Sequence, residues 1–207
     1  DSWLPAYTVH GEGLFLEFKE TTLSDWESTE NVDGRITPLR QRMNDVLVAR
    51  NLDQKEITAR FVLLHTFAHL LINRLTFECG YSAASLRERL YVSENPDNHM
   101  SGILIYTSSG DTQGSLGGLV RMGIPGRLEP VIEALLVQSR WCGNDPVCME
   151  QGSPAMGGQG TDSCNLAACH ACCLVPETSC EEFNRLLDRA TVSGDHERQI
   201  PGFFLDR

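Results

Sequence analysis

Seven of the eight cysteines lie between residues 142 and 180, and their spacing is the clearest chemical signal in the sequence. Cys169 and Cys172 form a Cys-x-x-Cys pair, while Cys142 and Cys148 form a wider pair with a turn-forming Asp-Pro dipeptide between them. Zn²⁺ favours four thiolate or imidazole ligands at the corners of a tetrahedron, and a close pair of cysteines directs two sulfurs at one point. We therefore expect these four thiols to hold a structural zinc ion, in a closed site that contributes folding energy and leaves no position for a substrate.

The ligand set is open to exchange because other donors lie nearby in the sequence. Cys180 is the first alternative, and Cys164, Cys173 and His170 are also within reach. Some of these cysteines are also compatible with small buried apolar residues, a common role of free cysteine. A redox role for the Cys-x-x-Cys pair is a third alternative, but no strand is predicted to precede it and neighbouring thiols would exchange with its disulfide.

A second candidate pair is His65 and His69, which are four residues apart and so share one face of a predicted helix. Two such imidazoles can occupy two corners of a metal site, but Thr66 stands where the gluzincin pattern has a glutamate. We favour a buried pair that is hydrogen-bonded to the backbone or to each other. The alternative is a metal-dependent hydrolase or nuclease that uses both histidines around an open coordination position.

The glycine-rich segment 110–118 is a weaker signal. The backbone amides of residues 114–119 could cradle a phosphate, but the lysine and the following Ser or Thr of a P-loop are missing. Close packing of this loop against the long helix is the favoured interpretation.

The elements that must position these groups include one long central helix. A capping-box-like pair, Asp53 and Glu56, predicts its start, and Gly80 predicts its end after Glu78. Its apolar residues recur at helical spacing with enough extra members to indicate burial on most sides.

Shorter elements are expected around this helix. Residues 12–18 and 102–108 have the composition of strands. Further helices are predicted from Thr37 and Pro38, over residues 82–90 and 127–141, and from Ser179, with Glu182 in the capping position, through Leu187.

The predicted fold class is therefore α+β, with the buried central helix and its neighbours packed on a small sheet and a cysteine-rich zinc lobe near the C-terminus. Residues 1–141 are expected to form the α+β core, 142–189 the zinc-binding lobe and 190–207 a C-terminal tail. The chain starts at Asp1 without an initiator methionine, and we expect it to be a piece of a longer protein.

Charge argues against a strong nucleic-acid grip by this chain alone. The 17 Lys and Arg against 28 Asp and Glu give a net charge of −11, whereas DNA affinity rests largely on phosphate neutralisation. The densest positive charge lies at Arg35, Arg40, Arg42 and Arg50, the expected DNA-facing surface in a larger assembly.

No stretch reaches the roughly 20 apolar residues of a membrane span. Clustered cysteines suit metal binding in a reducing compartment, so a cytoplasmic location is expected.

Several ordered segments together resemble the MrfA zinc-binding domain family. They are residues 65–71 (HTFAHLL), 102–107 (GILIYT), 114–119 (GSLGGL), 165–172 (NLAACHAC), 176–181 (PETSCE) and 187–189 (LDR). The likeness spans nearly the whole chain.

This resemblance implies a non-catalytic, zinc-binding accessory or scaffold module of a helicase-associated bacterial anti-phage defence complex of the DISARM type. The implied partner is the helicase subunit of the same system. DNA would be engaged only through the assembly.

Overall fold

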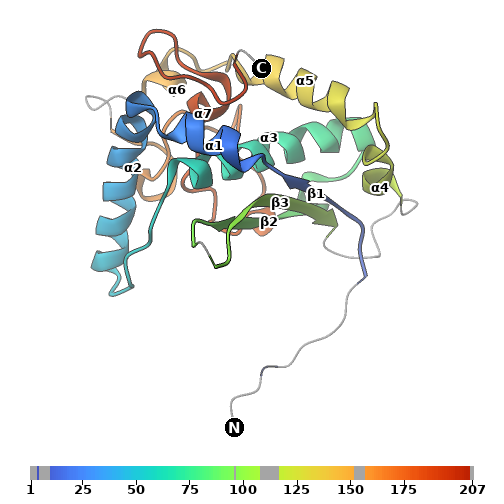
Figure 1. The fold of residues 1–207 in the computed structure, drawn as a ribbon, viewed down its shortest axis with the longest axis horizontal. Helices are drawn as coiled ribbons and strands as arrows, with labels where there is room; N and C mark the ends of the chain where they lie inside the picture. The colour runs from blue at the N-terminus through green and yellow to red at the C-terminus, as the bar shows by residue number, and fades with distance from the viewer. Residues whose placement is uncertain (1–3, 5–9, 96, 108–116, 152–156, 206–207) are drawn as a thin grey trace.

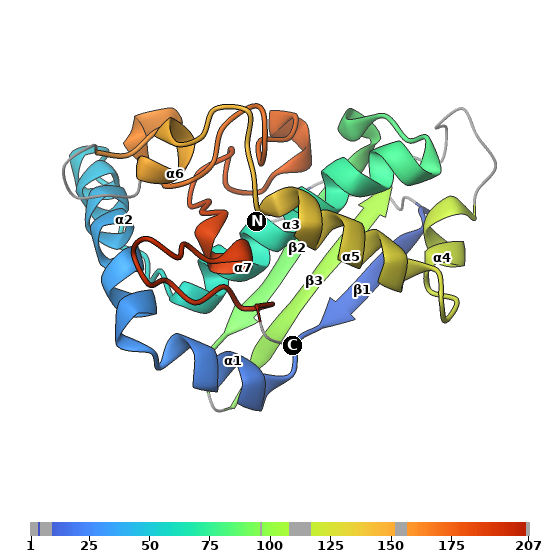
Figure 2. The ribbon, with the colours of Figure 1, turned by 90° about the horizontal axis from the view of Figure 1, so that it is seen from above.

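The computed structural model describes residue 4 and residues 10–95, 97–107, 117–151 and 157–205. Its helices gather on one face of a small antiparallel sheet (Figures 1 and 2). In chain order the elements are β1 (Gly13–Glu17), α1 (Glu20–Glu27), α2 (Glu30–Ala49), α3 (Ala59–Cys79), β2 (Leu86–Ser93), β3 (Met100–Thr107), α4 (Gly118–Met122), α5 (Leu128–Ser139), α6 (Val147–Glu150) and α7 (Ala190–Ser193). The fold is α+β, as predicted.

The sheet has the order β1-β3-β2, and both pairings of the central strand β3 are antiparallel. Leu14, Ile105 and Glu88 are opposite one another across the three strands and are buried on the helix side. Phe15 and Arg87 alternate to the other face and are exposed. The two strands predicted around residues 12–18 and 102–108 are confirmed, except that residue 108 lies outside the described ranges.

Helix α3 is the predicted central helix and is buried over most of its circumference. It ends as predicted at Gly80, whose φ of 73° is left-handed and suits glycine. Its predicted start is wrong, because Thr58 caps it and accepts a hydrogen bond at Oγ1 from the Phe61 amide at 3.3 Å. The segment before Thr58 is instead held non-helical by α2, where Arg40 Nε donates to the Ile57 carbonyl oxygen at 2.8 Å.

Three other helix predictions need correction. The helix expected from Thr37 already begins at Glu30, because the buried stripe that includes Val32 and Ile36 extends the packed face through Pro38. Residues 82–90 form one 3-10 turn and then strand β2. The final helix expected through Leu187 is absent, since residues 183, 184 and 186 have positive φ values.

The core is continuous across the three sequence ranges that were expected to be separate units. Leu71, Leu166 and Phe203 belong to one cluster of buried apolar side chains. A buried ion pair also crosses these ranges, because Arg35 Nε donates to Asp188 Oδ2 at 2.8 Å. The division at residues 141 and 189 stays a prediction about independent folding. Within the described ranges, no helix combines the length and apolar character that a membrane crossing requires.

Candidate metal centre

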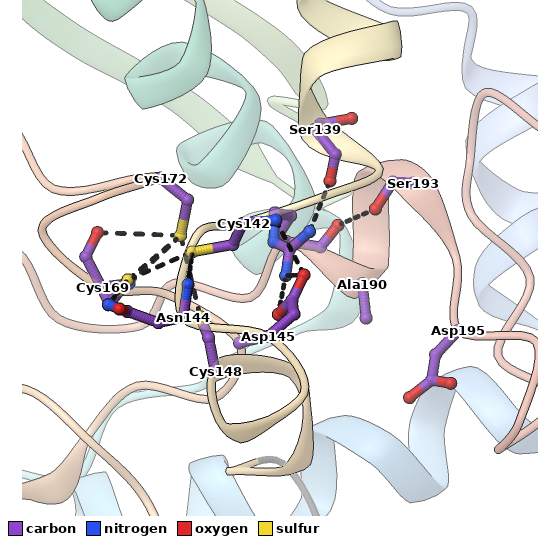
Figure 3. Close-up of polar contacts among 12 residues, drawn as sticks. Ser139, Cys142, Asn144, Asp145, Cys148, Cys169, Cys172, Ala190, Ser193 and Asp195 are labelled. Carbon is purple, nitrogen blue, oxygen red and sulfur yellow. Dashed lines mark hydrogen bonds and ion pairs between the residues drawn. The ribbon is translucent and has the colours of Figure 1, made fainter.

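Four cysteines, which we call the four-cysteine cluster, converge beneath the C-terminal end of α5 (Figure 3). The sulfur–sulfur distances are 3.5 Å for Cys142 and Cys169, 3.8 Å for Cys148 and Cys172, and 3.7 Å for Cys169 and Cys172. A zinc ion with Zn–S bonds of about 2.3 Å at the centre of a tetrahedron requires sulfur–sulfur edges of about 3.8 Å. Disulfide bonds are only about 2.05 Å long, so the spacing fits shared coordination of a metal.

Amide groups surround the sulfurs and favour their thiolate forms. The Asn144 backbone amide points at Cys142 Sγ at 3.5 Å, and the Asn144 side-chain amide donates to Cys169 Sγ at 3.3 Å. The backbone amide of Cys169 donates to Cys172 Sγ at 3.3 Å. Burial alone would raise the pKa of Cys169, but hydrogen bonds from the Asn144 side chain and the Ala171 backbone amide, and those with the thiols of Cys142 and Cys172, lower it to about 7. Burial raises the pKa of Cys142 to about 11, so a cation is needed before all four thiols can lose their protons together.

An ion pair between Arg189 and Asp145 stabilises the loop that carries Cys142 and Cys148 (Figure 3). Asp145 Oδ2 accepts a hydrogen bond from the Cys142 amide at 2.7 Å, and α6 places Cys148 a few residues later. Arg189, whose side chain is wholly buried, donates to both oxygens of Asp145 at 2.7 and 2.8 Å and to the Ser139 carbonyl oxygen at 2.9 Å. The loop that carries the first cysteine pair is therefore fixed to the end of α5.

The other candidate donors near this cluster take different places. Cys164 is buried in the apolar core, and its thiol points at the Asp162 carbonyl oxygen at 3.5 Å. His170 is exposed, and Cys173 is buried. Within the described residues, neither metal-compatible group includes any of these three side chains.

Cys180 does not lie with the four-cysteine cluster but in a second group with His65, His69 and Glu88, all four of which are buried. We call this group the His/Glu/Cys cluster. His65 Nε2 lies 3.1 Å from Glu88 Oε1 and 3.2 Å from Cys180 Sγ. The two imidazole rings meet edge to face with 4.6 Å between their centres. The predicted burial of the histidine pair is therefore confirmed.

Glu88 was missed by the sequence analysis because residues 82–90 were expected to be helical. In β2, alternate residues face opposite sides of the sheet, so Leu86 and Glu88 point at α3 while Arg87 and Arg89 point at solvent. The alternation of Leu86, Glu88 and Leu90 with exposed arginines is a two-residue period, and it was the signal that could have revealed this strand.

The Glu12 carboxylate accepts hydrogen bonds from backbone amides at the end of the glycine-rich segment. One of its carboxylate oxygens accepts hydrogen bonds from the amides of Gly117, Leu119 and Val120 at 2.8, 3.1 and 3.2 Å, and the other accepts one from the Tyr81 hydroxyl. Burial opposes ionisation of Glu12, but these hydrogen bonds lower its pKa below the ordinary value. The amides of the described part of the loop therefore bind an internal carboxylate. Residues 114–116 of the proposed phosphate cradle lie outside the described ranges.

Three of the four arginines expected to form a DNA-facing surface have intramolecular partners. Arg35 is buried with Asp188, so its predicted exposure is wrong. Arg40 Nη2 donates to Asp33 Oδ1 at 2.9 Å, and Arg50 Nη2 to Asp162 Oδ2 at 2.7 Å. The charges of these three arginines are paired within the fold, whereas half-buried Arg42 has no ion-pair partner among the described residues.

An α+β core with four converging cysteine sulfurs is typical of a metal-binding module, and comparison with known sequences places the chain in a family. Residues 67–173, about half of the chain, match the MrfA Zn-binding domain. The chain belongs to this family. It is also 42% identical over 210 residues to the DISARM protein DrmB of Bacillus paralicheniformis, and the match covers 99% of the chain and 35% of that protein. The chain therefore spans about a third of the length of this relative.

Proposed function

We propose that the four-cysteine cluster holds one structural zinc ion that fixes the C-terminal part of the chain to the α+β core. The observation that carries this proposal is the close approach of the four sulfurs. They all lie within 4.8 Å of one another, and three of their separations, 3.5 to 3.8 Å, match the edge of a zinc-centred tetrahedron. The surrounding N–H groups and the family's zinc-binding designation support it.

The proposed role is non-catalytic. Four protein ligands complete the tetrahedral shell of zinc and leave no position for a substrate or an activated water. The alternative hydrolase would use His65 and His69, but both side chains have zero solvent exposure and Cys180 and Glu88 close the space around them. Hydrolysis requires access of substrate and water to the metal, which this burial does not provide.

The biological role follows from the likeness to DrmB. The proposed module is an accessory or scaffold part of a DISARM-type anti-phage complex. Its proposed partner is the helicase subunit of that system. A net charge of −11 and the pairing of Arg40 and Arg50 with acidic side chains make direct DNA binding by this chain weak, because affinity depends on phosphate neutralisation. DNA is engaged through the assembly.

Replacement of one ligand tests the zinc and the scaffold role together. We expect Cys169→Ser to lose one zinc equivalent, measured by mass spectrometry of metals, and to lose co-purification with the helicase subunit. Cys164→Ala, a buried cysteine outside both metal-compatible groups, is the matched control and should retain both properties. Full zinc content in Cys169→Ser contradicts the ligand assignment, and co-purification of a zinc-depleted variant contradicts the scaffold role.

A further inference from the structure

The His/Glu/Cys cluster gathers four potential metal ligands from three separate parts of the fold. His65 and His69 come from successive turns of α3, Glu88 comes from β2, and Cys180 follows the 3-10 turn at Glu177–Ser179. One donor atom from each residue lies within 4.8 Å of the other three. The side chains of His65, His69 and Glu88 have no solvent exposure, and Cys180 is 7% exposed.

Hydrogen bonds between the four side chains do not satisfy their polar atoms. Three buried atoms have no hydrogen-bond partner: His65 Nδ1, His69 Nε2 and Glu88 Oε2. His65 Nε2 lies close to both Glu88 Oε1 and Cys180 Sγ, but a single N–H cannot serve both acceptors well. Buried polar and charged groups without partners are costly, and metal coordination is one of the few ways to compensate them. A cation at the centre would engage the unpartnered His69 Nε2 together with His65 Nε2, a Glu88 carboxylate oxygen and Cys180 Sγ.

Hydrogen bonds to the rest of the fold orient two of the four donors, His69 and Cys180. His69 Nδ1 lies 2.9 Å from the Cys173 carbonyl oxygen, which fixes the proton on Nδ1 and leaves Nε2 as an acceptor facing the cluster. The amides of Glu182 and Asn184 donate to Cys180 Sγ at 3.3 and 3.2 Å. Such an outer layer of hydrogen bonds is typical of metal ligands, because it orients them and stabilises their deprotonated forms.

We propose that His65, His69, Glu88 and Cys180 form a second, closed zinc site in the core. Two imidazoles, one carboxylate and one thiolate are all established zinc ligands, with bond lengths of about 2.0 to 2.3 Å. Tetrahedral edges of about 3.3 Å follow for nitrogen and oxygen donors. The Nε2 to Oε1 distances are 3.1 Å for His65 and 3.4 Å for His69. The ion joins the central helix, the edge strand β2 and the C-terminal segment.

The second site shares no ligand with the four-cysteine cluster, but the two are neighbours along the chain. Cys172 belongs to the first cluster, and the carbonyl of the next residue, Cys173, accepts the hydrogen bond of His69. The family match at residues 67–173 includes His69 and Glu88 but neither His65 nor Cys180. The proposed site is thus completed by residues on both sides of the matched segment.

The metal content of the purified full chain tests this proposal directly. We expect two zinc equivalents per chain and a zinc X-ray absorption spectrum that fits five sulfur and three nitrogen or oxygen neighbours over the two sites. Crystals should give two anomalous zinc peaks, one of them between α3 and β2. One equivalent with sulfur neighbours alone, unchanged after dialysis against zinc, overturns the second site and leaves the first intact.

Two conservative variants assign the ligands. We expect Glu88→Gln and His69→Gln each to fall from two zinc equivalents to one and to leave an all-sulfur absorption spectrum, while Cys164→Ala retains two. Cys169→Ser should show the reverse, with loss of sulfur neighbours and retention of the nitrogen and oxygen neighbours. Retention of both equivalents by Glu88→Gln and His69→Gln contradicts the proposal. If these variants fail to fold, the two anomalous peaks of the wild-type chain decide the question.

Discussion

The four-cysteine cluster and the His/Glu/Cys cluster differ in how far apart their members lie along the chain and how far they lie from water. The first is built from two local pairs, and Cys169 and Cys172 remain half-buried. The second joins residues as distant as His65 and Cys180, 115 positions apart, and all four of its residues are buried. Both have four donors and a layer of N–H groups around them.

This difference in sequence separation and burial implies that a metal ion plays a different role in each cluster. A local pair of cysteines can bind a metal with little more than a turn in place, so the ion itself organises an otherwise loop-rich segment. A cluster assembled from α3, β2 and the C-terminal segment exists only after the core has formed, so its ion strengthens a structure that is already folded. Metal release should therefore follow different routes at the two sites.

The largest expected effect is on metal loss to a chelator. Structural zinc binding is worth about 10 to 16 kcal/mol in small domains, so removal of zinc should unfold the segment around the four-cysteine cluster. We expect chelation of the wild-type chain to occur in two phases, with the first equivalent lost at least about tenfold faster because the second requires opening of the core. Release is measured with a colorimetric chelator, and proteolysis after each phase maps the opened residues. Release of both zinc equivalents in a single phase would contradict the proposed difference between the two sites.

An intermediate effect is expected from Asp145→Asn, which leaves the buried Arg189 guanidinium without its charged partner. Loss of one partner of a buried ion pair costs about 3 kcal/mol, and loss of an outer-layer contact lowers metal affinity about 10- to 100-fold. The weaker zinc affinity should appear only at the four-cysteine cluster, because Asp145 holds the Cys142 amide.

Urea unfolding and zinc competition titrations measure these two consequences of Asp145→Asn. Glu78→Gln removes an ion pair with Arg74 near the surface and is the control, with an expected change below about 0.5 kcal/mol. Equal weakening of both zinc equivalents in Asp145→Asn would show that the two clusters are not separable.

The smallest effect is expected at Glu12, which belongs to neither cluster. Its contribution to the free energy of unfolding should not depend on metal, so it is a reference for the two clusters. Hydrogen bonds lower the pKa of Glu12 below its ordinary value of 4.5, so the charged form contributes stability above that pH. The contribution is lost as the pH falls below 4.5 through the lowered pKa. We expect Glu12→Gln to cost about 1.5 kcal/mol at pH 7 and less at pH 4. The difference between wild type and variant is measured by urea unfolding at both pH values. A difference that grows on acidification contradicts this assignment.

Local patterns in the sequence determined much of the framework. The end of α3 at Gly80, the strands β1 and β3 and the α+β class follow from glycine geometry and from runs of apolar residues, which act over a few positions. The grouping of Cys142, Cys148, Cys169 and Cys172 was also predictable, because each pair is close in sequence and the tetrahedral preference of zinc supplies the rest.

The tertiary structure alone decided the second cluster. Glu88 faces α3 because residues 86–93 pair with β3 as a strand, and that pairing overrides the helical tendency of the Leu-Arg-Glu-Arg-Leu segment. Cys180 reaches His65 across 115 residues, and Arg35 is buried because Asp188 lies opposite it. Each of these contacts joins residues that are remote along the chain, and local propensity contains no information about which distant groups the folded core brings together.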